Sequence, residues 1–133
     1  MFTGILGNEE LKQILKRLRS SGRMPNAMLF AGPEGIGKRL FALEVGRSFI
    51  CTTHESDACG ECPACVRAGQ FEFPKPDDKD AYKKVIVSHH PDVALVTTIK
   101  RQIAVDAIRD LEREAHFHPN EGRGRTFIID DAD

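Results

Sequence analysis

The chain has no tryptophan and one tyrosine among its 133 residues, and it has no long apolar run. A membrane-spanning helix needs about 20 consecutive apolar residues, so no such helix is predicted. The amino terminus also lacks the basic-then-apolar pattern of a secretory signal. The net charge of −1 excludes strong binding of polyanions through bulk charge. These absences predict a globular cytoplasmic protein with no membrane contact.

Cysteine is also scarce, but its four copies are grouped in one segment. They are Cys51, Cys59, Cys62 and Cys65, spaced as Cys-x7-Cys-x2-Cys-x2-Cys. Disulfides are rare in a reducing compartment, whereas four thiolates complete the tetrahedral shell of a structural Zn²⁺. We therefore predict a zinc-binding insert over residues 51–69. An iron–sulfur cluster, free thiols and disulfides are the open alternatives, and His54 is an alternative ligand.

A glycine-rich segment carries the second motif. Residues 32–38 read Gly-Pro-Glu-Gly-Ile-Gly-Lys and follow the apolar run 27–31. This pattern predicts a strand that leads into a phosphate-binding P-loop, whose backbone N–H groups face an anion at a helix N-terminus. A glycine-rich turn without a ligand is the alternative. The candidate nucleotide-binding residues are Gly32, Gly35, Gly37, Lys38 and Arg39, for ATP or ADP.

The residue after the P-loop lysine departs from the pattern. A serine or threonine there holds Mg²⁺ through its hydroxyl, but this chain has Arg39, which cannot bind a metal. Asp130 and Asp131 end the apolar run 126–129, where a Walker-B strand places one acid near Mg²⁺ and a second acid near the attacking water. Asp131 is one methylene shorter than the usual glutamate. We expect both acids to be vestigial, Mg²⁺ binding to be doubtful and hydrolysis to be inefficient.

The remaining pattern alternates helices with strands. Apolar spacing predicts helices over residues 9–21, 38–50 and 104–118, and main strands over residues 27–31, 92–97 and 126–130. A further short strand is expected over residues 85–87, and residues 70–84 form a polar loop. This order predicts an α/β domain with a parallel sheet flanked by helices. Basic clusters at residues 16–23 and 123–125 are interpreted as solvated surface.

In this order, the features resemble the N-terminal part of a bacterial clamp-loader subunit, a P-loop NTPase domain of the AAA+ type in the DNA polymerase III holoenzyme. The matching stretches are residues 5–8, 27–38, the four-cysteine module, residues 90–93, Ile103-x4-Ile108-Arg109 and residues 128–133. Within the family, Gly-Lys-Arg at residues 37–39 and His-Pro-Asp at residues 90–92 favour the delta-prime branch. Gamma/tau sequences carry Gly-Lys-Thr and Asp-Glu at the corresponding motifs.

The resemblance implies an AAA+ sheet of five parallel strands in the order 5-1-4-3-2. Residues 1–133 would then be the N-terminal part of that domain, incomplete with strands 1–3 only. Strand 4, which lies between strands 1 and 3, is expected to be missing, together with strand 5, the lid and the collar. Without strand 4 the three expected main strands cannot form the family sheet. The gap left by strand 4 would leave backbone groups of strands 1 and 3 unpaired.

The resemblance also implies a function in DNA replication, in the bacterial cytoplasm. A delta-prime-like subunit helps the clamp loader place the sliding clamp on primed DNA, as a component of the DNA-directed DNA polymerase holoenzyme with little or no ATPase activity of its own. The expected partners are the gamma/tau and delta subunits, and through the complex the clamp and DNA. The alternatives are an ATP-hydrolysing gamma/tau-like motor subunit and a zinc-dependent interaction module without a nucleotide role.

Overall fold

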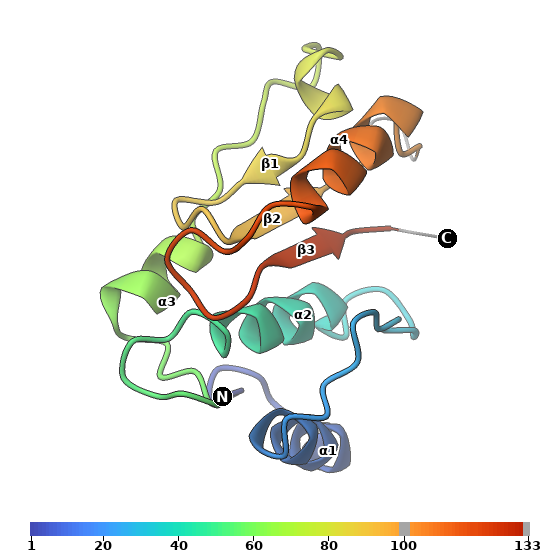
Figure 1. The fold of residues 1–133 in the computed structure, drawn as a ribbon. Coiled ribbons are helices and arrows are strands. Elements are labelled where there is room, and N and C mark those ends of the chain that lie inside the picture. Colours follow the sequence, from blue (N-terminus) through green and yellow to red (C-terminus); the bar gives the residue numbers. More distant parts are fainter. Residues whose placement is uncertain (99–101, 132–133) are drawn as a thin grey trace.

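A computed structural model describes residues 1–98 and 102–131 of the chain (Figure 1). In chain order its elements are α1 (Glu9–Ser20), α2 (Lys38–Arg47), α3 (Pro63–Ala68), the 3-10 helix η1 (Ala81–Lys83), β1 (Ile86–Val87), β2 (Val93–Val96), α4 (Val105–Ala115) and β3 (Thr126–Ile129). Helices and strands share one small domain, which confirms the α/β class. None of the helices in these ranges is both long and apolar enough to cross a bilayer.

The strands form one sheet in the order β1-β2-β3. β2 and β3 run parallel, with Val93 opposite Thr126 and Val96 opposite Ile129, and α4 connects them along the chain. β1 pairs antiparallel with β2. The prediction of a parallel sheet is therefore correct for β2 and β3 and wrong for β1, because the tight turn at residues 88–92 returns the chain directly alongside β1.

The strand predicted over residues 27–31 does not form. The segment is extended but belongs to no sheet, and Leu29 is 83% exposed. A strand is stabilised when its backbone N–H and C=O groups form hydrogen bonds to a neighbouring strand. No described segment pairs with residues 27–31 in this way. Only Phe30 is anchored, because its ring stacks on that of Phe41 at a centroid distance of 6.4 Å.

Two apolar patterns are less buried than the sequence predicts. β3 was expected to be buried throughout, but Ile129 is 41% exposed and only Ile128 is buried, because β3 is an edge strand in the described sheet. On α4, Ala107 and Asp110 face inward, whereas Val105 is 66% exposed. The Asp110 carboxylate turns inward because it accepts the Val85 N–H at 2.9 Å.

The hydrophobic core joins α1, α2 and the cysteine insert. Phe2 and Phe41 meet at a centroid distance of 5.2 Å, and both side chains are buried. The same cluster contains Leu15, Val45, Ile50, Ala64, Ala68 and Val93 together with Cys51, Cys62 and Cys65. α2 packs beside β3 and contacts α3, and Figure 1 shows α1 beyond α2. The insert is therefore part of the main core.

Candidate phosphate loop and metal centre

The glycine-rich loop lies between the extended segment 27–31 and the N-terminus of α2. Gly32, Gly35 and Gly37 have φ angles of 151°, 80° and 93°, which side-chain-bearing residues rarely adopt. A Cβ on Gly32 would also lie 2.5 Å from the Ile36 side chain. Lys38 donates a hydrogen bond from Nζ to the Gly32 carbonyl at 2.7 Å, across the loop. The backbone conformation of this loop therefore favours glycine at each of these three positions.

A cavity adjoins this loop. It has a volume of about 240 Å³, at the small end for a ligand site, and apolar side chains dominate its walls. Its lining includes Asn8 and Leu11 near α1, Ala31 before the loop, and Ile36, Lys38 and Phe41 from the loop and α2. Among the described residues that line it, Lys38 alone carries a full charge.

The structure brings Arg39 and Asp130 together, although they lie far apart in the sequence. Arg39 Nη1 lies 3.5 Å from Asp130 Oδ2. Asp130 is held at the carboxyl end of β3, because its N–H donates to the Val96 carbonyl at 3.0 Å and extends the parallel ladder. Asp131 is exposed and has a φ of +52°, so the backbone bends there, just past the strand.

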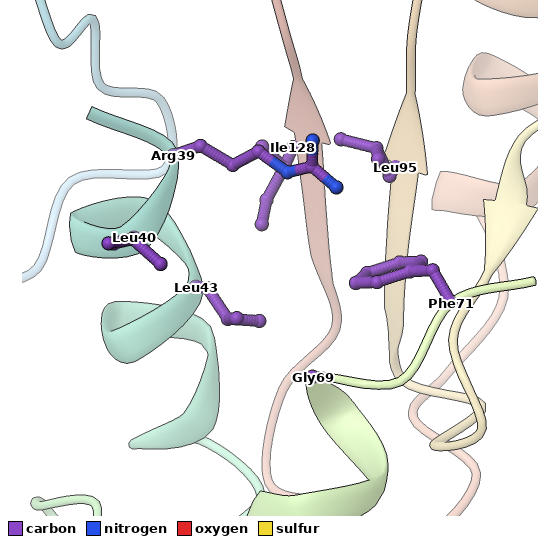
Figure 2. A pocket seen from close by; sticks show the side chains of 7 residues that line it. All are labelled: Arg39, Leu40, Leu43, Gly69, Phe71, Leu95 and Ile128. Carbon is purple, nitrogen blue, oxygen red and sulfur yellow. The ribbon is translucent and has the colours of Figure 1, made fainter. Parts of the chain in front are cut away.

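Behind Arg39 lies an apolar cavity of about 320 Å³ (Figure 2). Its walls are Leu40 and Leu43 from α2, Leu95 and Ile128 from the sheet, and Gly69 and Phe71 from the segment after α3. Arg39 is the one charged side chain among these described wall residues. Figure 2 shows the Arg39 side chain reaching from α2 across this cavity toward the strands.

The four cysteines form one cluster at the other end of the domain. Their Sγ atoms all lie within 4.8 Å of one another, and all four thiols are free. Tetrahedral Zn–S bonds of about 2.3 Å place sulfurs about 3.8 Å apart, so a small contraction would suit this ion. The Cys62 N–H points at Cys59 Sγ (3.2 Å) and the Cys65 N–H at Cys62 Sγ (3.4 Å). Four sulfurs with oriented amides fit a metal ion such as zinc.

The environments of these thiols differ. Burial raises the pKa of Cys62, but hydrogen bonds from Thr52 and the Cys65 N–H outweigh burial and lower it to about 5. Burial likewise opposes ionisation of Cys51, and hydrogen bonds led by Thr53 bring its pKa to about 7. Burial raises the pKa of Cys65 strongly. Thiolates are the metal-binding form, so the lowered pKa values of Cys62 and Cys51 favour metal binding by this cluster.

Two arginines hold the start of the insert, a role that the sequence did not indicate. Arg19 donates to Ser48 Oγ at 3.1 Å and to the Glu55 carbonyl at 2.9 Å. Arg123 donates to the carbonyls of Cys51 at 3.0 Å and His54 at 2.7 Å. The prediction that these basic residues are merely solvated is wrong for this pair, because the chain turns at residues 48–55 and leaves several carbonyls that need donors. It is also wrong for Arg125, which is 9% exposed and donates to the Glu114 carbonyl at 2.7 Å.

A buried acid organises the loop before β3. The Asp92 carboxylate accepts the N–H groups of Asn120 (2.6 Å), Glu121 (2.8 Å) and Gly122 (2.6 Å). Burial raises the pKa of Asp92, but these three bonds outweigh it and hold the pKa below its ordinary value. Gly122 is required here because a Cβ would lie 2.5 Å from the Ile50 side chain. The motif at residues 90–92 did not indicate this role of Asp92.

His90 connects this loop to α3. It is buried, and its Nδ1 accepts the Asp92 N–H at 3.1 Å, which leaves the proton on Nε2 facing Glu121 at 3.4 Å. Burial lowers the pKa of His90, which favours the neutral ring. Glu121 also pairs with Arg67 of α3 at 2.7 Å. Through Glu121 and Arg67, His90 therefore links the turn before β2 to α3 of the cysteine insert.

Comparison with known proteins identifies the family. A family model described as DNA polymerase III, delta subunit, matches residues 7–78 and 74–133. The chain belongs to the clamp-loader subunit family of DNA polymerase III. Similar curated proteins include DNA polymerase III subunit gamma/tau of Mycobacterium bovis (30% identical over 98% of this chain and 20% of that protein), subunit tau of Escherichia coli (26% over 98% and 18%) and subunit delta′ of Bacillus subtilis (28% over 95% and 34%).

The chain spans about a fifth to a third of the length of these curated relatives. No solved structure gives a significant match. Residues 90–93, which carry part of the resemblance, contain the buried His90 and Asp92. Residues 132–133 of the stretch 128–133 lie outside the described residues. Family membership confirms the replication context predicted from the motifs.

Proposed function

We propose that this chain is the N-terminal part of a delta-prime-like clamp-loader subunit in bacterial DNA replication. It would contribute an AAA+ domain to a complex with gamma/tau and delta subunits that places the sliding clamp on primed DNA, in the cytoplasm. Family membership supports this role, and so does the match to a delta′ subunit over 95% of the chain. The four-cysteine insert would hold a structural Zn²⁺, with four protein ligands and no open position for a substrate.

One observation carries the proposal that the nucleotide site is degenerate. Arg39 stands where the P-loop supplies a metal-binding hydroxyl, and it pairs with Asp130, the candidate metal acid, at 3.5 Å. Asp131, the candidate for orienting water, is exposed in a turn. Phosphate contacts would then come from Lys38 and the loop glycines, while a neighbouring subunit hydrolyses ATP.

We expect the full-length gene product to assemble with gamma/tau and delta subunits of its own organism and to support clamp loading on primed DNA. Lys38→Ala in this chain should leave loading unchanged, because the hydrolysing sites lie on other subunits. Co-elution in size-exclusion chromatography and a loading assay with labelled clamp test both statements. A protein that stays separate from these subunits would refute the proposed role.

A second function is favoured by the names of several relatives, which are gamma/tau subunits at up to 30% identity. In that case the full-length protein would turn over Mg-ATP, and Lys38→Ala would abolish turnover because the P-loop lysine neutralises the outer phosphates. A steady-state phosphate-release assay decides between the two functions. Our proposal expects no turnover above background in either protein, and clear turnover by the unsubstituted protein would select the motor subunit.

A further inference from the structure

Two arginines from distant segments meet at the backbone that carries Cys51. Arg19 of α1 and Arg123 of the loop before β3 both donate to the Ser48 carbonyl, at 3.2 Å and 3.1 Å. Arg123 also donates to the Cys51 carbonyl at 3.0 Å, and its backbone N–H donates to the Phe49 carbonyl at 2.8 Å. The two guanidinium groups therefore lie close together and bind the same turn of the chain.

These two positive charges have no acidic partner in the described part of the chain, where no carboxylate lies within ion-pair distance of Arg19 or Arg123. The groups that accept their hydrogen bonds are carbonyls and one hydroxyl, all uncharged. Arg47 differs, because it donates to the Cys65 carbonyl at 2.8 Å and is paired with Glu44 at 2.7 Å. Burial, and then the charge of Arg123, lowers the pKa of Arg19. Two like charges held together are unfavourable unless a nearby anion compensates them.

The cysteine cluster would supply such an anion when it holds zinc. Its four Sγ atoms lie within 4.8 Å of one another, and Cys51 and Cys65 are fully buried. Four thiolates carry more negative charge than one Zn²⁺ neutralises, so the centre as a whole is an anion. Residues around a metal site orient its ligands and set its affinity for the ion. Positive charge beside the backbone of this cluster therefore favours the metal-bound form.

Cys51 is separated along the chain from the other three candidate ligands. It lies eight residues before Cys59, whereas the other three cysteines are close in sequence and are linked by N–H to sulfur contacts. We propose that Arg123, together with Arg19, holds Cys51 in position for zinc and compensates the negative charge of the four-thiolate centre. This inference rests on the proposed zinc site and adds the residues that control how tightly the site holds its metal.

The test is competition for zinc between the full-length gene product and a coloured chelator, under reducing conditions. Arg123→Met removes the charge and its hydrogen bonds, so the dissociation constant for zinc should rise at least about tenfold. Arg123→Lys keeps the charge and one donor group, and it should recover part of this loss. Arg17→Met is the matched control, because Arg17 is exposed on the same helix as Arg19. Its dissociation constant should stay within about twofold of that of the unsubstituted protein.

Cobalt spectra separate a positioning role from a general loss of stability. With Co²⁺ in place of zinc, the unsubstituted protein should show the visible bands of a tetrahedral four-thiolate complex. In Arg123→Met these bands should move to shorter wavelength, because water or an imidazole replaces the displaced Cys51 thiolate in part of the molecules. A variant that is only less stable would lose band intensity without a change in wavelength, and that result would count against the inference.

Unchanged zinc affinity and unchanged cobalt bands in Arg123→Met would overturn the inference. If that variant does not fold, Arg19→Met takes its place, because Arg19 binds the same turn, and its zinc affinity should fall by about tenfold. An affinity equal to that of Arg17→Met would then overturn the inference. An unsubstituted protein without zinc overturns both the zinc assignment and this inference. Co-elution with gamma/tau and delta is scored separately, so a zinc-bound, assembling protein that is indifferent to Arg123 refutes the inference and leaves the proposed function intact.

Discussion

Replacing Cys62 with serine is expected to abolish zinc binding and to unfold the whole described domain, not the insert alone. Cys51, Cys62 and Cys65 belong to the same buried cluster as Phe41 and Val45 of α2. Structural zinc contributes about 10 kcal/mol or more in small domains, which is comparable with the whole stability of a domain. With zinc bound as proposed, loss of one ligand would therefore remove most of the free energy that keeps this core folded.

Elemental analysis and thermal unfolding by circular dichroism check this prediction. The unsubstituted protein should be colourless with one zinc per chain, and Cys62→Ser should lose both the zinc and the cooperative transition. His54→Ala is the matched control, because His54 lies in the insert but outside the sulfur cluster, and it should keep both. An iron-containing brown protein would contradict the zinc assignment. A Cys62→Ser protein that melts like the parent would show that the insert is independent of the core.

Replacing Asp92 with asparagine is expected to lower the free energy of unfolding by about 3 kcal/mol at neutral pH, because a buried, satisfied charge is lost. The carboxylate accepts three backbone N–H groups and faces Arg125 Nε at 3.9 Å, and its side chain is fully buried. An asparagine amide has one oxygen for these donors and turns an N–H₂ group toward the others. Urea unfolding measures the difference, and Asp80→Asn, 91% exposed, is the control.

The effect of Asp92 should depend on pH in one direction. The pKa of Asp92 is lower in the folded protein than the ordinary value of about 3.9. The contribution of Asp92 to the free energy of unfolding is therefore complete above the ordinary pKa and is lost as the pH falls through the folded pKa. The difference between parent and Asp92→Asn should therefore be constant from neutral pH to about pH 5 and shrink at lower pH. Loss of metal in acid affects both proteins, so their difference isolates Asp92. A difference that grows in acid would contradict this account.

The sequence predicts most successfully where the chemistry is local. The glycines at 32, 35 and 37 require positive φ angles within one loop, and the structure has them. The cysteine spacing likewise brings four sulfurs together over a short segment. Helix positions follow from apolar spacing and from breakers such as Gly22, whose φ of 71° ends α1. In each case a few neighbouring residues contain the whole cause.

The failures concern partners that are distant in the chain. Residues 27–31 have the composition of a buried strand, but a strand also needs a neighbour, and the described residues supply none. Composition also could not show that Asp92 would bind the backbone of residues 120–122, or that Arg19 and Arg123 would hold the insert. Each of these contacts depends on how two separate segments are packed, which residue spacing does not encode directly.

The amino-acid sequence alone determined the positive φ angles of the glycine-rich loop, the four-thiol cluster, the α/β class and the family. Tertiary structure alone decided that Arg39 neutralises Asp130, that β1 runs antiparallel, and that the insert shares the main core. The reason is the separation along the chain between the residues that interact. Dihedral preferences and ligand spacing act over a few neighbouring residues. Ion pairs, strand pairing and burial depend on which distant segments the fold places side by side.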